Sequence, residues 1–143
     1  NALDDYEEGN LVWLLTKTTH PTQGSTNGSS VKYVKVGRLV HISGLIRTDG
    51  NNSDGSGYFR FQSGSTLPFT PETSGTSVIG HWRSQDSQSG ELTGSIAWSA
   101  GSTTLYIYSP TLRSQYAAVS NNVAVSSQTN LVITFSLTYR ANA

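Results

Sequence analysis

The stretch that decides the fold is Val31–Gly44, which reads VKYVKVGRLVHISG. It predicts two β-strands joined by a tight turn at Gly37-Arg38, because valine, isoleucine and tyrosine favour a pleated, half-buried backbone. Gly37 supplies the conformational freedom that a two-residue hairpin turn requires. Gly44 leaves a strand position without a side chain, which indicates a β-bulge or a close approach of neighbouring backbone. This hairpin is therefore expected to be a scaffold element.

Alternating apolar and polar segments continue on both sides of the hairpin. The clearest is 131–139, whose odd-numbered residues Leu131, Ile133, Phe135, Leu137 and Tyr139 form one apolar face. Further strands are expected at 11–18, 58–62, 78–83, 92–98 and 104–108, with short ones at 116–119 and 123–125. No segment shows convincing helical periodicity. The pattern predicts an all-β fold, an antiparallel β-sandwich of jelly-roll type.

Length and charge indicate one domain with an acidic lead-in. The chain has 143 residues, nine Lys and Arg, and nine Asp and Glu, so its net charge is zero. Four of the acidic residues, Asp4, Asp5, Glu7 and Glu8, lie among the first ten residues. We therefore expect residues 1–10 to be an acidic N-terminal connector and residues 11–143 to be the β-sandwich domain. The basic residues are scattered singly, which argues against a nucleic-acid partner, and no apolar run is long enough for membrane insertion.

The sequence offers little for catalysis or metal binding. Cysteine is absent, no Gly-x-Ser-x-Gly segment occurs, and the three histidines lack partners at metal-ligand spacing. Asp86 and Glu91 are the only carboxylates that flank one loop as a glycosidase pair would, and solvated loop residues are the preferred interpretation. The segment Asp49–Gly57 offers oxygens at alternate positions but departs from the EF-hand pattern, so an ordinary turn is favoured and a looser calcium site stays open. We expect no enzyme activity, no cofactor and no metal.

Three short motifs carry a resemblance to a known family. They are Leu3–Gly9 (LDDYEEG), Tyr33–Val40 (YVKVGRLV), and Leu67–Pro71 (LPFTP). In this order and at this spacing they resemble the distal domains of bacteriophage tail-fibre and other virion structural proteins. The resemblance covers the first half of the chain.

The resemblance implies a virion component that forms a homotrimer at the end of a fibre. It implies attachment to a host-surface glycan without catalysis, and contact with other virion proteins through the N-terminal side. The location would be the virion, on a tail fibre or tailspike or on the capsid surface. The alternative is a head-fibre, capsid decoration or cement protein with a purely structural role. A depolymerase fragment is the third reading, although a catalytic tailspike would normally add a much longer solenoid.

Glycan binding predicts its own set of residues. Sugars stack their C–H faces on aromatic rings, while Asp and Arg side chains bond the hydroxyls. Candidates lie where strands run into polar loops or where aromatics alternate with inward residues: Trp82, Arg83, Asp86, Tyr106, Tyr108, Arg113 and Tyr116. The competing interpretation is that Trp82 belongs to the core and that the tyrosines pack across a subunit interface. Trp13 and Trp98 are expected in the core.

Overall fold

The computed structural model shows an antiparallel β fold. It describes residues 5–17, 29–47, 58–61, 64–72, 77–84, 93–98, 105–108, 123–124 and 132–142. These residues form ten strands and no helix, so the expected all-β class is confirmed. Within the same ranges, nothing helical is present that could cross a bilayer.

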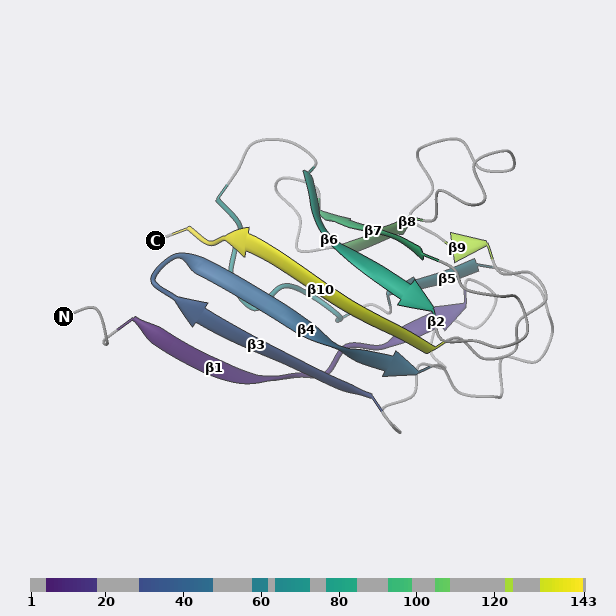
Figure 1. The fold of residues 1–143 in the computed structure, drawn as a ribbon, viewed down its shortest axis with the longest axis horizontal. Coiled ribbons are helices and arrows are strands. Elements are labelled where there is room, and N and C mark those ends of the chain that lie inside the picture. The colour runs from purple at the N-terminus through teal and green to yellow at the C-terminus, as the bar shows by residue number, and fades with distance from the viewer. Residues whose placement is uncertain are drawn as a thin grey trace.

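The larger sheet contains seven strands in the order β1-β3-β4-β10-β6-β7-β8, and all of its strand pairs are antiparallel (Figure 1). Its strands are β1 (Tyr6–Leu11), β3 (Ser30–Val36), β4 (Leu39–Arg47), β10 (Val132–Arg140), β6 (Ser77–Ser84), β7 (Thr93–Trp98) and β8 (Leu105–Tyr108). β1 begins and β10 ends at the end of the sheet where the turn between β3 and β4 lies.

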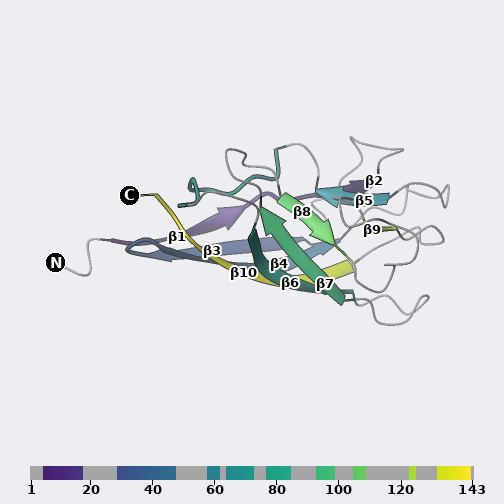
Figure 2. The ribbon, with the colours of Figure 1, turned by 90° about the horizontal axis from the view of Figure 1, so that it is seen from above.

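A smaller sheet of three strands lies beside one face of the larger sheet (Figure 2). Its strands are β2 (Leu15–Lys17), β5 (Tyr58–Phe61) and β9 (Val123–Ala124), in the order β2-β5-β9. Trp13 joins the two sheets, because its ring stacks on Phe135 of β10 and meets the edge of Phe61 of β5, both at 5.7 Å between ring centroids. The face of the large sheet that carries Phe135 is called the inner face below, and the opposite face is the outer face.

The predicted hairpin is confirmed. β3 and β4 pair in continuous register from Ser30↔Leu45 to Val36↔Leu39, and the turn lies at Gly37-Arg38. Gly37 has a φ of 58°, the left-handed conformation that glycine adopts without steric cost. Of the two expectations for Gly44, the close backbone approach is the one observed: a Cβ added there would lie 2.3 Å from the carbonyl oxygen of Ser30.

The core lies on the inner face and follows the predicted alternation. On β10, Ile133, Phe135, Leu137 and Tyr139 are buried, as the sequence predicts. Further core side chains come from β3, β4, β6, β7 and β8 of the large sheet and from the segments beside it: Trp13, Leu15, Val31, Val40, Ile42, Ile46, Phe61, Leu67, Trp82, Ile96, Trp98, Leu105, Ile107 and Ala141. The expected core positions of Trp13 and Trp98 are therefore confirmed.

The N-terminal segment differs from the expected connector. Tyr6–Leu11 forms β1, the edge strand of the large sheet, and pairs with β3 along its whole length. The described part of the acidic segment thus belongs to the sheet. The physical reason is the edge position, since charged side chains on an edge strand reach water and discourage pairing with foreign strands.

The expected single strand at 11–18 is interrupted at 12–14, between β1 and β2. A loop distant in sequence takes over the hydrogen bonds of this interruption. The Trp13 Nε1–H donates to the Thr66 carbonyl at 3.0 Å, and the Leu14 N–H donates to Ser65 Oγ at 2.8 Å. Ser65 in turn donates to the Leu14 carbonyl at 3.2 Å. These bonds let the chain leave the large sheet and enter the small one without stranding buried polar groups.

Candidate functional site

The structure divides the residues predicted to bind a glycan. Trp82 is buried in the core with 2% of its surface exposed, so the core interpretation applies to it and it offers no ring to a surface ligand. Arg83 follows it on β6 and is exposed. Tyr106 and Tyr108 lie on β8, the other edge strand of the large sheet. Asp86, Arg113 and Tyr116 lie outside the described residues.

The backbone register brings Arg83 near the tyrosine-bearing strand. Arg83 pairs with Thr93 of β7, and Tyr108 pairs with Ser95 of the same strand. One strand therefore separates Arg83 from β8, and their β7 partners are two positions apart. Among the predicted residues, the structure brings together this arginine and the strand of the two tyrosines.

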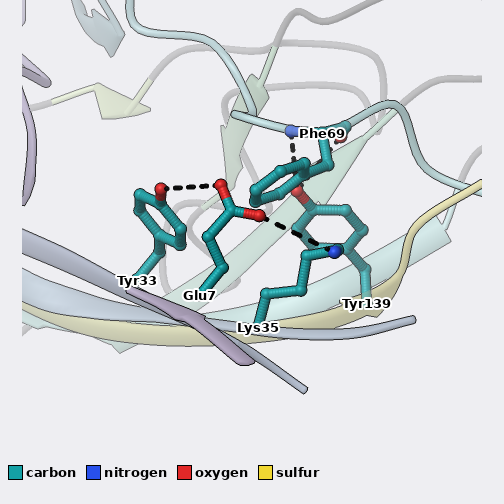
Figure 3. Close-up of polar contacts among 5 residues, drawn as sticks. All are labelled: Glu7, Tyr33, Lys35, Phe69 and Tyr139. Atoms are coloured by element: carbon teal, nitrogen blue, oxygen red, sulfur yellow. Dashed lines mark hydrogen bonds and ion pairs between the residues drawn. The ribbon is translucent and has the colours of Figure 1, made fainter. Parts of the chain in front are cut away.

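A second group of residues gathers at the end of the sheet near the hairpin turn, on the inner face (Figure 3). We call it the end cluster: Glu7 of β1, Tyr33 and Lys35 of β3, Phe69 of the loop 64–72, and Tyr139 of β10. In the register of the sheet, Glu7 pairs with Lys35, Lys35 with Val40 of β4, and Val40 with Tyr139. These residues therefore form one row across four adjacent strands. The cluster joins segments that are far apart in the sequence.

Aromatic and charged contacts surround the ring of Phe69. The Tyr33 and Phe69 rings meet edge to face at 5.5 Å and 75°, and Lys35 Nζ lies 5.2 Å from the centre of the Phe69 ring. Glu7 binds both partners, through an ion pair with Lys35 at 3.7 Å and as acceptor of the Tyr33 hydroxyl at 3.4 Å. Each contact is weak by itself because this end of the sheet is half exposed to water.

Gly9 makes room for the Tyr33 ring. A Cβ at Gly9 would lie 2.6 Å from Cε1 of Tyr33, its partner on the adjacent strand. The ring therefore lies across β1 where the glycine lacks a side chain. Desolvation, and secondly the negative charge of Glu7, raise the pKa of the Tyr33 hydroxyl above its ordinary value.

Tyr139 fastens the loop 64–72 to the sheet. Its hydroxyl donates to the Phe69 carbonyl at 3.1 Å and accepts from the Phe69 N–H at 3.3 Å. The side chain is buried, and desolvation raises the pKa of the hydroxyl to about 12, against a smaller lowering by the hydrogen bond to Phe69. The neutral phenol is thus the form that the fold requires.

This raised pKa predicts a loss of stability at alkaline pH. A phenol that ionises at about 12 in the fold and at 10 when unfolded holds its proton more tightly in the fold. Its contribution is complete below pH 10 and disappears as the pH rises from 10 to 12. Urea unfolding at pH 9 and pH 11.5 is expected to show wild type losing about 2 kcal/mol more than Tyr139→Phe between these values. An equal pH dependence of the two proteins would contradict this role of the hydroxyl.

Ion pairs and backbone hydrogen bonds close the same end of the sheet. Glu72 pairs with Arg38 at 2.8 Å and with Arg140 at 3.3 Å, and Arg38 Nε donates to the Ala141 carbonyl at 3.0 Å. The backbone N–H groups of Ala141 and Asn142 donate to Arg38 and Thr70, at 2.7 and 2.8 Å. The hairpin turn, the loop and the last residues of β10 are therefore tied together.

The end cluster and the neighbouring ion pairs of Glu72 have a structural role, because they hold the loop 64–72 against the sheet. The carboxylates of Glu7 and Glu72 both face cationic side chains. Within the ranges that the structure describes, no three His, Asp or Glu side chains gather as a metal site. These contacts join the loop 64–72 to the hairpin turn and to the end of β10.

Sequence reasoning missed two features of this end. It did not predict that the three motif segments meet. The contact of Glu7 with Tyr33 spans 26 residues, the contact of Tyr33 with Phe69 is also distant in the sequence, and neither leaves a local periodic signal. It also assigned no role to the exposed apolar residues Val34, Val36 and Leu39. A signal for these was present, because both faces of the hairpin carry apolar side chains, and a strand with one solvated face would alternate.

Comparison with protein-family models finds no match, and comparison with the curated proteins and with the solved structures finds none either.

Proposed function

We propose that the chain is a non-catalytic, homotrimeric β-sandwich domain of jelly-roll type in a bacteriophage virion. It forms the tip of a tail fibre or tailspike, and it attaches the particle to a glycan on the host surface. Its N-terminal side faces other virion proteins. The sandwich reading is supported by the two sheets that share Trp13 in one core.

The observation that carries this proposal is the meeting of the three motifs. Glu7 and Gly9 come from the first motif, Tyr33 and Lys35 from the second, and Phe69 from the third. The second motif joins the other two in the end cluster, because Tyr33 and Lys35 contact both Glu7 of the first motif and Phe69 of the third. Three short segments that build one physical unit are stronger grounds for a family resemblance than three separate matches, because the contacts explain why the motifs occur together.

The attachment surface is proposed around β6 and β8. Arg83 is exposed, and its guanidinium carries five N–H donors that suit sugar hydroxyls. Tyr106 and Tyr108 on β8 would supply rings for stacking, and Asp86, Arg113 and Tyr116 complete the proposed set. Trp82 is left out because it is buried.

Binding of the fluorescently labelled domain to intact candidate host cells tests the proposal. We expect saturable binding that purified surface polysaccharide competes away. Arg83→Ala is expected to weaken it by roughly 10-fold, the effect of losing about 1.4 kcal/mol of charged hydrogen bonding. Arg47→Ala is the matched control, since Arg47 is also exposed on the outer face, on β4, and should bind like wild type.

Two results would overturn the proposal that the domain attaches to its host without catalysis. Absence of binding across a broad panel of hosts would favour the structural alternative, a head-fibre, decoration or cement protein. Sustained release of reducing sugar from host polysaccharide would favour the depolymerase reading. The structural alternative has one observation in its favour, the exposed apolar side chains on the outer face.

A further inference from the structure

Four apolar side chains form an exposed corner on the outer face of the large sheet. Tyr6 of β1, Val36 of β3 and Leu39 of β4 stand side by side in register, and their exposed fractions are 53%, 54% and 52%. Val34, two positions along β3, is 36% exposed. We call these four residues the outer apolar corner. They lie next to the hairpin turn, on the face opposite the end cluster.

Most of the outer face on the neighbouring strands is polar or charged, apart from the half-buried Leu45 and Val132. Beyond the corner, β4 and β10 present His41, Ser43, Ser136 and Thr138. His41 is itself satisfied there, since its Nδ1 lies 3.0 Å from Thr138 Oγ1. Within the described strands of the large sheet, the exposed large apolar side chains are thus gathered at the corner, and a localised apolar patch of this kind marks an interaction site.

Charged side chains of both signs flank the corner on the same face. Arg140 of β10 is the register partner of Leu39, and it pairs with Glu72 at 3.3 Å. Glu8 is the register partner of Val34, and Lys32 lies two positions before Val34 on β3. Both are exposed, and neither forms an ion pair within the described residues. Glu8 accepts a hydrogen bond from the Tyr6 hydroxyl at 2.5 Å, which holds its carboxylate at the edge of the apolar group.

An apolar centre with Glu8 and Lys32 beside it can be complementary to further copies of itself. Around a threefold axis, each copy can place its Lys32 against Glu8 of the next copy while the apolar side chains of the three corners meet near the axis. The chain has no net charge, so copies do not repel one another at long range. A sugar would find few hydrogen-bonding groups over the corner.

We infer that the outer apolar corner is the contact surface between copies of this chain, and that its occupant is the same corner region of a neighbouring copy. The inference rests on the proposed function only in taking the assembly to be a homotrimer. Tyr6, Val36 and Leu39 are then buried between subunits, and Glu8 of one subunit faces Lys32 of the next.

The native mass of Leu39→Lys, measured by light scattering over a range of concentrations, tests this surface. A lysine would bury an unpaired charge against the neighbouring copy, so we expect the concentration of half-dissociation to rise by ~100-fold or more relative to wild type. Ser136→Lys is the matched control. It places the same side chain on an exposed position of the outer face, on β10, and is expected to keep the wild-type mass.

Val36→Thr provides a second variant that keeps the branched shape of the side chain and the strand. It is expected to weaken the assembly less than Leu39→Lys and more than Ser136→Lys. Circular dichroism melting of each monomer confirms that the chain is folded. A Leu39→Lys protein that stays as associated as wild type, or a Ser136→Lys protein that dissociates equally, would overturn the inference.

Cell binding of the same samples separates this inference from the proposed function. Wild-type protein that is monomeric at all concentrations and still binds cells would overturn the interface and leave attachment standing. Wild-type trimers that dissociate with Leu39→Lys but bind no cells would support the interface and overturn attachment.

Discussion

Replacing Trp13 with alanine is expected to lower the free energy of unfolding by about 3 to 5 kcal/mol, the range for large aromatic side chains lost from a core. Trp13 is 2% exposed, and its ring contacts side chains of both the small sheet and the large one. Its ring stacks on Phe135 with an interplanar angle of 12° and meets Phe61 at 73°. The substitution also leaves the Thr66 carbonyl without the indole N–H that donates to it at 3.0 Å.

Urea unfolding followed by circular dichroism measures this loss, since the signal of the strands does not depend on the indole itself. Trp13→Phe keeps a ring in the core but removes the N–H donor, so a smaller loss of about 1 to 2 kcal/mol is expected. Val12→Ala is the matched control, because Val12 is the preceding residue and is 71% exposed. A loss below about 1 kcal/mol for Trp13→Ala would contradict its role in joining the sheets.

Gly44→Ala is expected to lower the free energy of unfolding by about 2 to 4 kcal/mol, at the upper end of overpacking effects. A Cβ there would lie 2.3 Å from the Ser30 carbonyl oxygen and 2.8 Å from the Val31 Cα. Both are backbone atoms of the adjacent part of the β3 region, so relief requires β3 and β4 to move apart. That movement would disturb the paired register that carries the rest of the hairpin.

Gly37→Ala distinguishes steric conflict from the general cost of replacing glycine. Gly37 has a φ of 58°, but an added Cβ would meet nothing within 4 Å. A cost of only about 1 to 2 kcal/mol is therefore expected from the left-handed backbone. Thermal and urea unfolding of the two variants under the same conditions give the comparison. A Gly44→Ala protein more stable than Gly37→Ala would contradict the steric account.

Local sequence signals were sufficient for the parts of the fold that depend on alternation. The hairpin at 31–44, the inward residues of β10 and the buried pair Ile96 and Trp98 all follow from apolar side chains at every second position. Glycine positions also carried information, since the close approach at Gly44 was one of two expectations from the sequence.

The remainder depended on contacts that no local pattern records. β1 carries Glu7 and Glu8, which lower its resemblance to a strand, and only its edge position makes these charges acceptable. The interruption at 12–14 depends on Ser65 and Thr66, more than fifty residues away. The end cluster likewise needs the loop 64–72 to fold back on the sheet.

The candidate binding residues show the same limit. Alternation alone could not decide whether Trp82 faces the core or solvent, because the strand phase on β6 shifts at the irregularity between Val78 and Gly80. The structure places Trp82 in the core and leaves Arg83 exposed. The outer apolar corner was visible in the sequence as apolar side chains on both faces of one hairpin, but its confinement to one end of the sheet required the register.

The most direct test of the account is the native mass of the unmodified 143-residue chain, measured by light scattering across a wide range of concentrations. The account predicts a species of three times the chain mass, which dissociates on dilution and depends on the outer apolar corner. A chain that remains monomeric at every concentration would contradict the homotrimer, and with it the assignment of the corner to contacts between copies.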